Sequence, residues 1–249
     1  GLWPRAYPPS LTVGPGEQAF GAWLKIGRDG IVTVAVPQAE HGQGIATTLA
    51  QVVADELGAD WRTVAVEPAP LSPLYANPVG VDSLFEGAFD RLPEGVRREW
   101  LRRDRVMLTA GSSSLRMFEE PARAAAATAR ALMAQAAARR WSVDWNSCEA
   151  RDGFIVHGEQ RLRFAELAEA AASETVPEPL PLGSGGAGRL AGTDVPRLDS
   201  PAKIDGSANF TADIRLPDMV HVAVRHAPLG ETRAIRIDRA AAMKMPGVV

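Results

Sequence analysis

The sequence predicts an α+β fold, because strand patterns and a helix pattern alternate along its N-terminal part. Residues 22–26 and 31–36 alternate and favour β structure, and Asp29-Gly30 between them is typical of a hairpin turn. Apolar side chains then recur at helical spacing over residues 45–57, and residues 63–67 form the next strand candidate. The predicted order of strand, strand, helix and strand is an α+β unit.

Single residues mark the ends of these predicted elements. Pro37 ends the second strand, because proline has no backbone N–H to donate to a sheet. A polar, glycine-rich turn over residues 38–44 precedes the helix. Gly58 follows the helix where a left-handed residue commonly ends one.

Residues 96–108 are predicted to form a locally basic helix. Its arginines are Arg97, Arg98, Arg102, Arg103 and Arg105. One interpretation is a solvated face on which these side chains pair with Glu94, Glu99 and Asp104. The other is a docking surface for an acidic partner. We favour the first, because a run of mixed charges usually marks a solvated face.

An alanine-rich helix is predicted to begin at Pro121, since proline suits the first helical position, and to run to about Arg140. Eleven of the seventeen residues from 122 to 138 are alanine. Such a helix has little side-chain bulk, and its backbone can lie very close to a neighbouring element. We therefore expect it in a crowded interior.

Beyond this helix the predicted structure changes character. Residues 154–157 and 161–163 predict a second small hairpin, and residues 164–172 a short helix. From Ser173 to Pro196 the composition turns to proline, glycine and small residues, as in a linker or surface strap. A β-rich unit is expected from about Arg197 onward.

This last unit is predicted to hold three short strands, over residues 213–216, 220–224 and 234–237. The sequence then stops at an apolar pair, Val248-Val249, whose partner strands are missing. We therefore expect a fragment, or one member of a split assembly. Without their natural neighbours, residues 1–180 should then expose apolar patches that favour self-association.

Composition disfavours several classes of protein. The 249 residues carry 27 basic and 30 acidic side chains, a net charge of −3, so no basic field exists to gather nucleic acid. No apolar run reaches the roughly 18 residues that a membrane span needs. The single cysteine, Cys148, forbids an internal disulfide and cannot supply a thiolate metal site. The four histidines lack the spacing typical of zinc ligands.

Two glycine-containing segments ahead of helices are the candidate sites. In Glu40-His41-Gly42-Gln43-Gly44 the glycines let the backbone approach a ligand, and a helix N-terminus favours an anion or oxo group. A plain tight turn explains this segment equally well. In Gly111-Ser112-Ser113-Ser114 the hydroxyl and N–H groups suit a phosphate, or they simply cap a helix.

Three stretches, in one order along the chain, carry a resemblance to a known family. They are residues 36–61 (VPQAEHGQGIATTLAQVVADELGADW), residues 111–116 (GSSSLR) with the helix up to Trp141, and residues 197–210 (RLDSPAKIDGSANF). Together they resemble the molybdenum-binding large subunits of the xanthine oxidase/aldehyde oxidase superfamily. The isoquinoline 1-oxidoreductase beta-subunit type is the branch they resemble most.

The resemblance implies three regions. Residues 1–180 would be the N-terminal part of a molybdopterin-binding lobe of the molybdenum hydroxylase type, residues 181–196 a linker, and residues 197–249 the incomplete beginning of an a/b hammerhead domain. The cofactor implied for the intact assembly is molybdopterin, in bacteria usually as the cytosine dinucleotide.

Residue roles follow from the matching motifs. Gln43 would hydrogen-bond near the oxo ligand of the molybdenum, with Gly42 and Gly44 letting the loop pass close. The segment that would face the pterin or its phosphates is Gly111, Ser112, Ser113 and Ser114. The family's Gly-Phe-Gly-Gly segment and its glutamate base have no counterpart here. No catalytic residue or metal ligand is therefore expected in this chain, which alone should be inactive.

The activity implied is hydroxylation of aldehydes or N-heterocycles with oxygen from water. The partners implied are the remainder of the large subunit, an iron–sulfur small subunit and a cytochrome c as electron acceptor. These branches often carry a twin-arginine export signal, so we expect the periplasm ahead of the cytoplasm. The alternative hypothesis is a non-catalytic module that keeps the lobe for assembly or partner docking.

The sequence also departs from the family pattern. His41 stands where methionine is more common, and Ala110 where glycine is usual. An arginine-bearing insertion between Pro78 and Gly111 is longer than the resemblance predicts.

Overall fold

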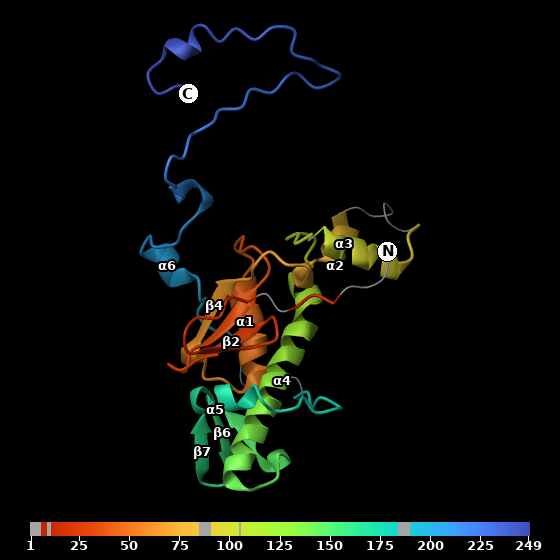
Figure 1. Cartoon of the computed structure of the whole chain (residues 1–249), viewed down its shortest axis with the longest axis vertical. Coiled ribbons are helices and arrows are strands. Elements are labelled where there is room, and N and C mark those ends of the chain that lie inside the picture. Colours follow the sequence, from red (N-terminus) through yellow and green to blue (C-terminus); the bar gives the residue numbers. More distant parts are fainter. Residues whose placement is uncertain (1–5, 9–10, 85–90, 105, 184–189) are drawn as a thin grey trace. The chain divides into compact units, whose positions relative to one another are not determined.

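Figure 1 shows the computed structural model of the chain. The structure describes residues 6–8, 11–84, 91–104, 106–183 and 190–249. The chain divides into two compact units, Gly1–Ala208 and Asn209–Val249. The first unit holds both sheets and every long helix among the described residues.

The first sheet has four strands in the order β1-β2-β3-β4. Antiparallel neighbours are β1 (Glu17–Phe20), β2 (Leu24–Gly27) and β3 (Val32–Val36), and β4 (Val64–Pro68) pairs parallel with β3. The predicted hairpin is confirmed as β2 and β3, and the predicted third strand as β4. The sequence pattern does not indicate β1, which adds a strand beside β2.

The connection from β3 to β4 runs through α1 (Ile45–Leu57), as predicted. Gly58 ends this helix in the left-handed conformation, with a φ of 75°, and its N–H bonds to the carbonyls of Ala54 and Asp55. A Cβ atom added at Gly58 would lie 2.5 Å from the carbonyl oxygen of Ala150. Only glycine suits this position, because both the backbone conformation and the neighbouring chain exclude a side chain.

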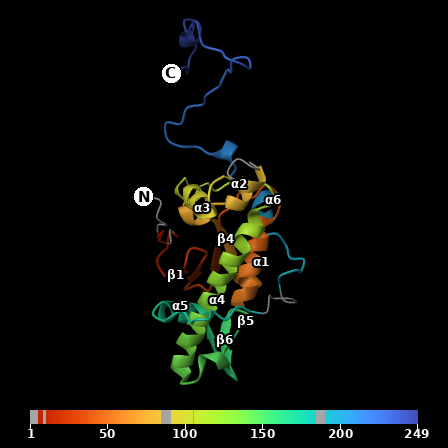
Figure 2. The same cartoon turned by 90° about the vertical axis from the view of Figure 1, so that its right-hand side faces the viewer.

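The alanine-rich helix is α4 (Ser114–Trp141), which packs along α1 (Figure 2). The prediction that it begins at Pro121 is wrong, since the helix begins about two turns earlier and Pro121 lies inside it. Proline removes one helical hydrogen bond there. The first two turns are nevertheless held, because Phe118 is 1% exposed and Leu115 packs against the core.

The expected crowded interior is confirmed. Ala122, Ala126 and Ala129 are completely buried, and they share one face of α4 at spacings of four and three residues. Large side chains of α1 and the first sheet fill the space that these methyl groups leave, among them Leu49, Val53 and Ile26.

Two shorter helices fill the connection from β4 to α4, namely α2 (Pro78–Leu84) and α3 (Glu94–Arg103). The prediction that the basic helix continues to Leu108 is wrong. The backbone beyond it pairs elsewhere, since Val106 accepts a hydrogen bond from the N–H of Asn77.

The arginines of α3 are largely paired. Arg98 bonds Glu94, Arg103 bonds Glu99, and Arg97 reaches Asp82 of α2 at 3.1 Å. These pairs support the interpretation of a solvated, internally paired face. Arg105 lies outside the described residues.

The second sheet is antiparallel, in the order β5 (Glu149–Arg151), β6 (Phe154–His157) and β7 (Gln160–Arg163). It confirms the second hairpin, and the short helix follows as α5 (Phe164–Ala171). Ile155, Phe164 and Leu167 are at most 2% exposed and belong to the same core as α1 and α4. Short 3-10 helices stand at Trp61–Thr63, Pro73–Tyr75, Trp145–Ser147, Thr211–Asp213 and Ala242–Lys244.

Residues 190–198 lie along the polar side of α1. The N–H of Leu198 donates to Thr47 Oγ1 at 3.0 Å. Gln51 Nε2 donates to the carbonyls of Leu190 and Thr193. A short helix, α6 (Ser200–Ile204), follows this segment.

The three strands predicted after Arg197 are wrong. None of residues 209–249, all of which the structure describes, forms a strand, and every one of them is exposed. A strand needs a hydrogen-bonded neighbour and an apolar surface beneath it, and these residues have neither within their own unit. Among the described residues, no helix is both long and apolar enough to cross a membrane.

The contact of Gly58 with Ala150 leads to a testable prediction. We expect Gly58→Ala to lower the free energy of unfolding by about 1–2 kcal/mol for the left-handed backbone, and by about 1–3 kcal/mol more for the clash. Gly30→Ala is the matched control, because Gly30 has a φ of 86° but no atom within 4 Å of its added Cβ. Urea unfolding of both variants measures the difference, and equal losses would contradict the proposed clash.

Candidate functional site

The structure brings the two candidate segments together. Segment 40–44 precedes α1 and segment 111–114 precedes α4, and the two helices pack with these ends on the same side. Ser114 Oγ donates a hydrogen bond to Gln38 Oε1 at 3.1 Å. The N–H of Ala39 donates to Thr109 Oγ1 at 3.0 Å. Two helix N-termini therefore meet at one place.

Asn77 binds segment 111–114, and its Nδ2 atom lies 3.5 Å from Oε1 of Gln38, which stands ahead of segment 40–44. It is completely buried, and its Nδ2 atom lies 2.7 Å from both the Leu108 carbonyl oxygen and Ser113 Oγ. Its Oδ1 atom accepts a hydrogen bond from the N–H of Gly80 at 2.9 Å. Asn77 is not among the predicted site residues, although an asparagine before Pro78 carries a signal for the start of a helix.

The N-terminus of α1 is capped by a carboxylate of the chain itself. Glu40 Oε1 accepts hydrogen bonds from the N–H groups of Gly42 at 2.7 Å and Gly44 at 2.9 Å, and Glu40 Oε2 accepts one from Ala46 at 3.2 Å. Gly42 and Gly44 both have a positive φ, which turns their N–H groups toward this carboxylate. The donors expected to face an anionic ligand thus already bind an anion.

Gln43 is exposed and partly engaged within its own loop. Its Nε2 atom donates to the Ala39 carbonyl at 2.8 Å, and its Oε1 atom accepts from the N–H of His41 at 2.6 Å. The second hydrogen of the Gln43 amide has no partner among the residues that the structure describes. One donor of this segment therefore remains available to a ligand.

Arg197, which begins the third motif (residues 197–210), binds the glycine-rich loop (residues 40–44) of the first motif. Its Nη1 atom donates to the Gly42 carbonyl at 2.8 Å and its Nη2 atom lies 3.1 Å from Glu40 Oε1. Asp199 binds the same guanidinium at 2.9 Å through both carboxylate oxygens. Arg197 is not among the predicted site residues, since a contact over 155 residues leaves no local signal.

Segment 111–114 has a different character. Gly111 and Ser112 adopt the left-handed conformation, with φ values of 65° and 50°. Ser113 is completely buried and its Oγ atom donates to the Ala110 carbonyl, while Ser114 bonds Gln38. Ser113, at the N-cap, makes no side-chain cap, and no other side chain among the described residues accepts from the first turn of α4, so its N–H groups are left for another acceptor. Ser112 is exposed beside them.

The charges around Glu40 stabilise its ionised form. Burial alone would raise the pKa of the Glu40 carboxyl, but hydrogen bonds from three backbone N–H groups and the positive charge of Arg197 outweigh burial and lower it. Hydrogen bonds from Arg197 and Lys203 likewise hold the pKa of Asp199 well below its usual range. Both carboxylates are therefore ionised at neutral pH, and each forms an ion pair with Arg197.

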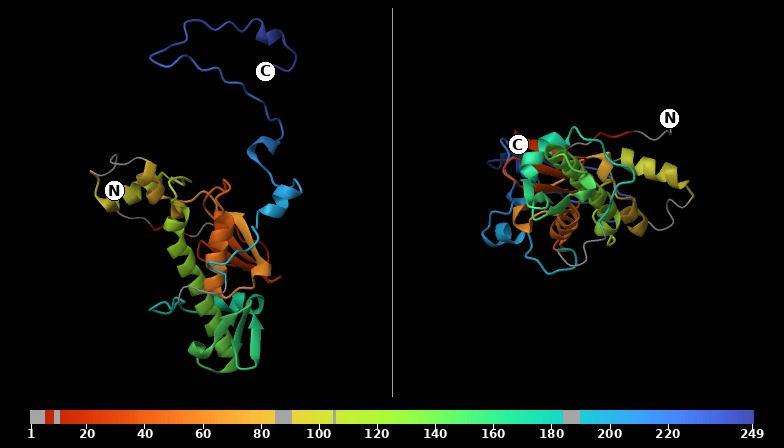
Figure 3. Two further views of the ribbon diagram at one scale, coloured as in Figure 1. Left: turned by 180° about the vertical axis from the view of Figure 1, so that it is seen from behind. Right: turned by 90° about the horizontal axis from the view of Figure 1, so that it is seen from below.

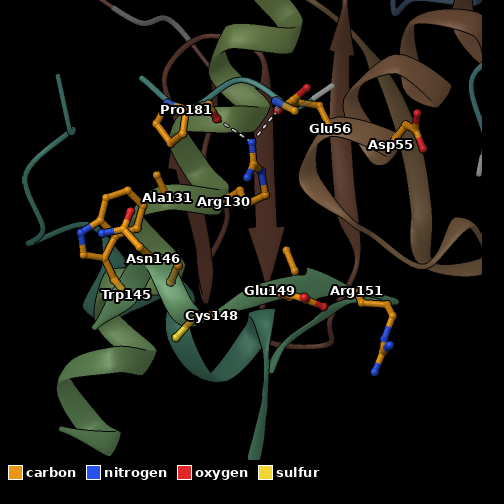
Figure 4. Close-up of a pocket in the computed structure, with 13 residues that line it drawn as sticks. Asp55, Glu56, Arg130, Ala131, Trp145, Asn146, Cys148, Glu149, Arg151 and Pro181 are labelled. Carbon is orange, nitrogen blue, oxygen red and sulfur yellow. Dashed lines mark hydrogen bonds and ion pairs between the residues drawn. The ribbon is translucent and has the colours of Figure 1, made fainter. Parts of the chain in front are cut away.

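A cavity of about 440 Å³ lies elsewhere, beside the second half of α1 (Figure 4). Glu56, whose side chain is 2% exposed, accepts hydrogen bonds there from Arg123 Nε at 3.0 Å and Arg130 Nη2 at 2.6 Å. The same carboxylate accepts the N–H of Gly183, and Arg130 also bonds the Pro181 carbonyl. This cluster fastens residues 181–183 to α1 and α4.

Within the described part of the chain, no group of three or more histidine, cysteine, aspartate or glutamate side chains is arranged to hold a metal ion. Burial and the charge of Asp144 raise the pKa of the Cys148 thiol, so this cysteine is a poor thiolate ligand. The arrangement can instead offer hydrogen-bond donors to an anionic group, chiefly at the start of α4.

Comparison with known proteins agrees with the motifs. Residues 5–71 match the family described as molybdopterin cofactor-binding domain. The chain is 30% identical to the beta subunit of isoquinoline 1-oxidoreductase from Brevundimonas diminuta, in an alignment that covers 91% of this chain and 31% of that protein. The predicted resemblance to the molybdenum-binding large subunits is confirmed.

Two further relatives are 28% identical to this chain. Membrane-bound aldehyde dehydrogenase [pyrroloquinoline-quinone] of Gluconacetobacter polyoxogenes is matched over 94% of this chain and 28% of its own length. The B subunit of nicotinate dehydrogenase from Pseudomonas putida is matched over 97% of this chain and 19% of its own length. The chain thus spans less than a third of the length of the curated relatives that it matches.

A solved structure with local likeness is quinoline 2-oxidoreductase from Pseudomonas putida 86. It is 20% identical over 64% of this chain and 17% of its own, and the TM-score is 0.34, an overlap too slight to define the fold.

The carboxylate cap of α1 leads to a pH prediction. The folded-state pKa of Glu40 lies below its ordinary value of 4.5, so its contribution to stability is full above that pH and is lost as the pH falls through the lower value. We expect Glu40→Gln to cost about 1–2 kcal/mol near neutral pH, because the amide replaces a charged acceptor at a helix N-terminus. The gap between variant and wild type should shrink in acid.

Urea unfolding at a series of pH values measures this gap. Glu94→Gln serves as the control, since Glu94 belongs to an exposed pair within α3 and should contribute less than about 0.5 kcal/mol. A gap for Glu40→Gln that stays constant down to strongly acid pH would show that the carboxylate charge does not stabilise the loop.

Proposed function

We propose that this chain is the N-terminal part of a molybdopterin-dependent oxidoreductase that hydroxylates aldehydes or N-heterocycles with oxygen from water. The observation that carries the proposal is the meeting of segments 40–44 and 111–114 at the N-termini of two packed helices. The names of the relatives support the reaction class, since they act on isoquinoline, nicotinate and aldehydes. The match to a molybdopterin cofactor-binding domain supports the cofactor.

The donors of the site fit a group that bears phosphates. The first turn of α4 has unclaimed N–H groups, and Ser112 adds an exposed hydroxyl beside them. Gly111 turns the chain there with a positive φ. Only glycine fits this position, because an added Cβ would lie 2.5 Å from the Cβ of Ser83. We assign the phosphates of molybdopterin, as its cytosine dinucleotide, to Gly111 and Ser112, with Ser113 and Ser114 holding the segment in place.

The first segment has a different part in the proposal. The Glu40 carboxylate already occupies the N–H groups of Gly42, Gly44 and Ala46 at the start of α1, so we assign phosphate to α4. Gln43 offers its free amide hydrogen toward an oxo ligand, while Gly42 and Gly44 shape the loop. When bound, the molybdenum centre supplies two-electron oxidation chemistry that no side chain can supply. The chain itself binds and orients the cofactor.

The remaining assignments belong to the whole protein. We propose that residues 1–180 contribute to the cofactor lobe, that residues 181–196 connect it, and that residues 197–249 begin an a/b hammerhead domain. The proposed partners are the rest of the large subunit, an iron–sulfur small subunit and a cytochrome c. The proposed location is the periplasm, reached by twin-arginine export. The chain alone should be inactive, because it carries no counterpart of the family's glutamate base.

Cofactor content of the intact protein, purified with its iron–sulfur partner, tests the proposal. We expect Ser112→Ala to weaken cofactor retention by roughly 10- to 100-fold, the value of one hydrogen bond to a charged group. Ser142→Ala is the matched control, because Ser142 also has a left-handed φ, of 57°, but lies at the opposite end of α4. Molybdenum is measured by mass spectrometry and released pterin by fluorescence.

Gln43→Ala should leave the phosphates bound and therefore retain the pterin while turnover is lost. A well-folded complex that contains neither molybdenum nor pterin would overturn the proposal. That result would favour a non-catalytic assembly or docking module. Equal losses in the Ser112 and Ser142 variants would remove the assignment of phosphate to the start of α4.

A further inference from the structure

The outer face of the second sheet carries three exposed arginines, Arg151 on β5 and Arg161 and Arg163 on β7. None of the three forms an ion pair with any residue in the described part of the chain. Figure 3 shows this sheet alongside the C-terminal half of α4. Arg28, Arg62 and Arg98 are exposed as well, but each of them pairs with a carboxylate.

The strand register places these arginines on one face. Arg151 pairs with Phe154, Phe154 pairs with Arg163, and Val156 pairs with Arg161. Because successive side chains of a strand point to opposite faces, all of these residues share the face opposite to Ile155, which is completely buried. We call this surface the arginine face and define it by Arg151, Phe154, Arg161 and Arg163.

The half-buried Phe154 ring organises the charges around it. The guanidinium carbons of Arg161 and Arg163 lie 5.3 Å and 5.6 Å from its centre, within the range of a cation–π contact. Arg151 lies beside the ring on β5. Arg151 and Arg163 are two strand spacings apart, which is about 10 Å. The side chain of Arg151 points away from the Glu56–Arg130 cluster (Figure 4).

On the strand face itself, arginines outnumber carboxylates three to one. Glu149 is the one carboxylate on that side of the described strands, while Asp152 and Glu159 stand outside the face, in the adjoining turns. The chain as a whole carries a net charge of −3, so an excess of arginine is a local feature. Arginine and aromatic side chains are also the residues most often found at the energetic centre of protein interfaces.

We propose that the arginine face docks an extended acidic segment of a partner protein. Each guanidinium can bind a carboxylate through two parallel hydrogen bonds, and the row of Arg151, Phe154 and Arg163 matches carboxylates about 10 Å apart. Nucleic acid fits this surface less well, because its charge is repeated along a length that three arginines do not cover. The inference does not depend on the proposed cofactor.

Fluorescence polarisation with a labelled oligoglutamate peptide tests the docking surface. In the intact protein, the triple variant Arg151→Gln/Arg161→Gln/Arg163→Gln should bind the peptide at least about tenfold more weakly, a loss that one charged hydrogen bond already explains. The matched control is Arg28→Gln/Arg62→Gln/Arg98→Gln, which changes the net charge equally but removes arginines that are already paired. Its affinity should stay within about twofold of wild type, because rim charges outside a contact change affinity little.

Thermal unfolding checks that both triple variants fold. If the first does not, Arg151→Gln alone provides the test, because Arg151 does not stack on Phe154. Failure of the wild-type protein to bind the peptide, or equal losses in both triple variants, would overturn the proposal. Equally tight, equally arginine-dependent binding of oligouridine or phosphatidylserine vesicles would also overturn it, since the face would then attract anions in general.

Discussion

The burial of α1 on all sides is the constraint on which the rest of the first unit depends. Eleven of its thirteen residues are buried, and four of these, Thr47, Gln51, Asp55 and Glu56, are polar or charged. A buried polar group without a partner costs about 1–3 kcal/mol, so each of these side chains requires one. Residues 190–198 supply partners for the first three, and arginines of α4 supply them for Glu56. A segment with the composition of a linker thereby becomes part of the packing.

The two ends of α1 use glutamate in opposite ways. Glu40 lies at the N-terminus, where the helix dipole and three free N–H groups favour a negative charge. Glu56 lies in the last turn, where the dipole opposes a negative charge, and two arginines offset that cost. Both carboxylates also bind a distant segment, Arg197 at one end and Gly183 at the other. The helix that carries the candidate site is thus fixed at both ends.

The sequence predicts elements well where the signal is local. The Asp29-Gly30 turn, the helical spacing before Gly58 and the hairpin ahead of α5 each depend on neighbouring residues, and all are confirmed. Strands that need a distant partner are harder to predict. Residues 220–224 alternate as a strand does, yet nothing in their unit pairs with them. Pro121 misleads for a related reason, because burial of Phe118 holds the helix before it.

In the candidate site, too, the features with a local signal are predictable from the sequence and the contacts between distant residues are not. Both segments carry glycines and polar residues ahead of helices, which a sequence reveals. Gln38, Asn77 and Arg197 join or hold the segments through contacts over long separations, and such contacts leave no local pattern. Asn77 carries a local signal only for the start of a helix.

The unequal chemistry of the two helix N-termini gives the site a direction. A glycine-rich turn before a helix suggests an anion site in both segments. The contacts of Glu40 show that, at α1, a carboxylate of the chain itself already occupies this site. The cap holds Gly42 and Gly44 in their turned conformation, and the Gln43 side chain of that loop keeps one amide hydrogen for a ligand. The uncapped start of α4 keeps its N–H groups for a ligand. In the proposed function, the first segment therefore shapes and positions while the second binds charge. An elongated ligand with a phosphate at one end and an oxo group at the other could lie across them in only one direction.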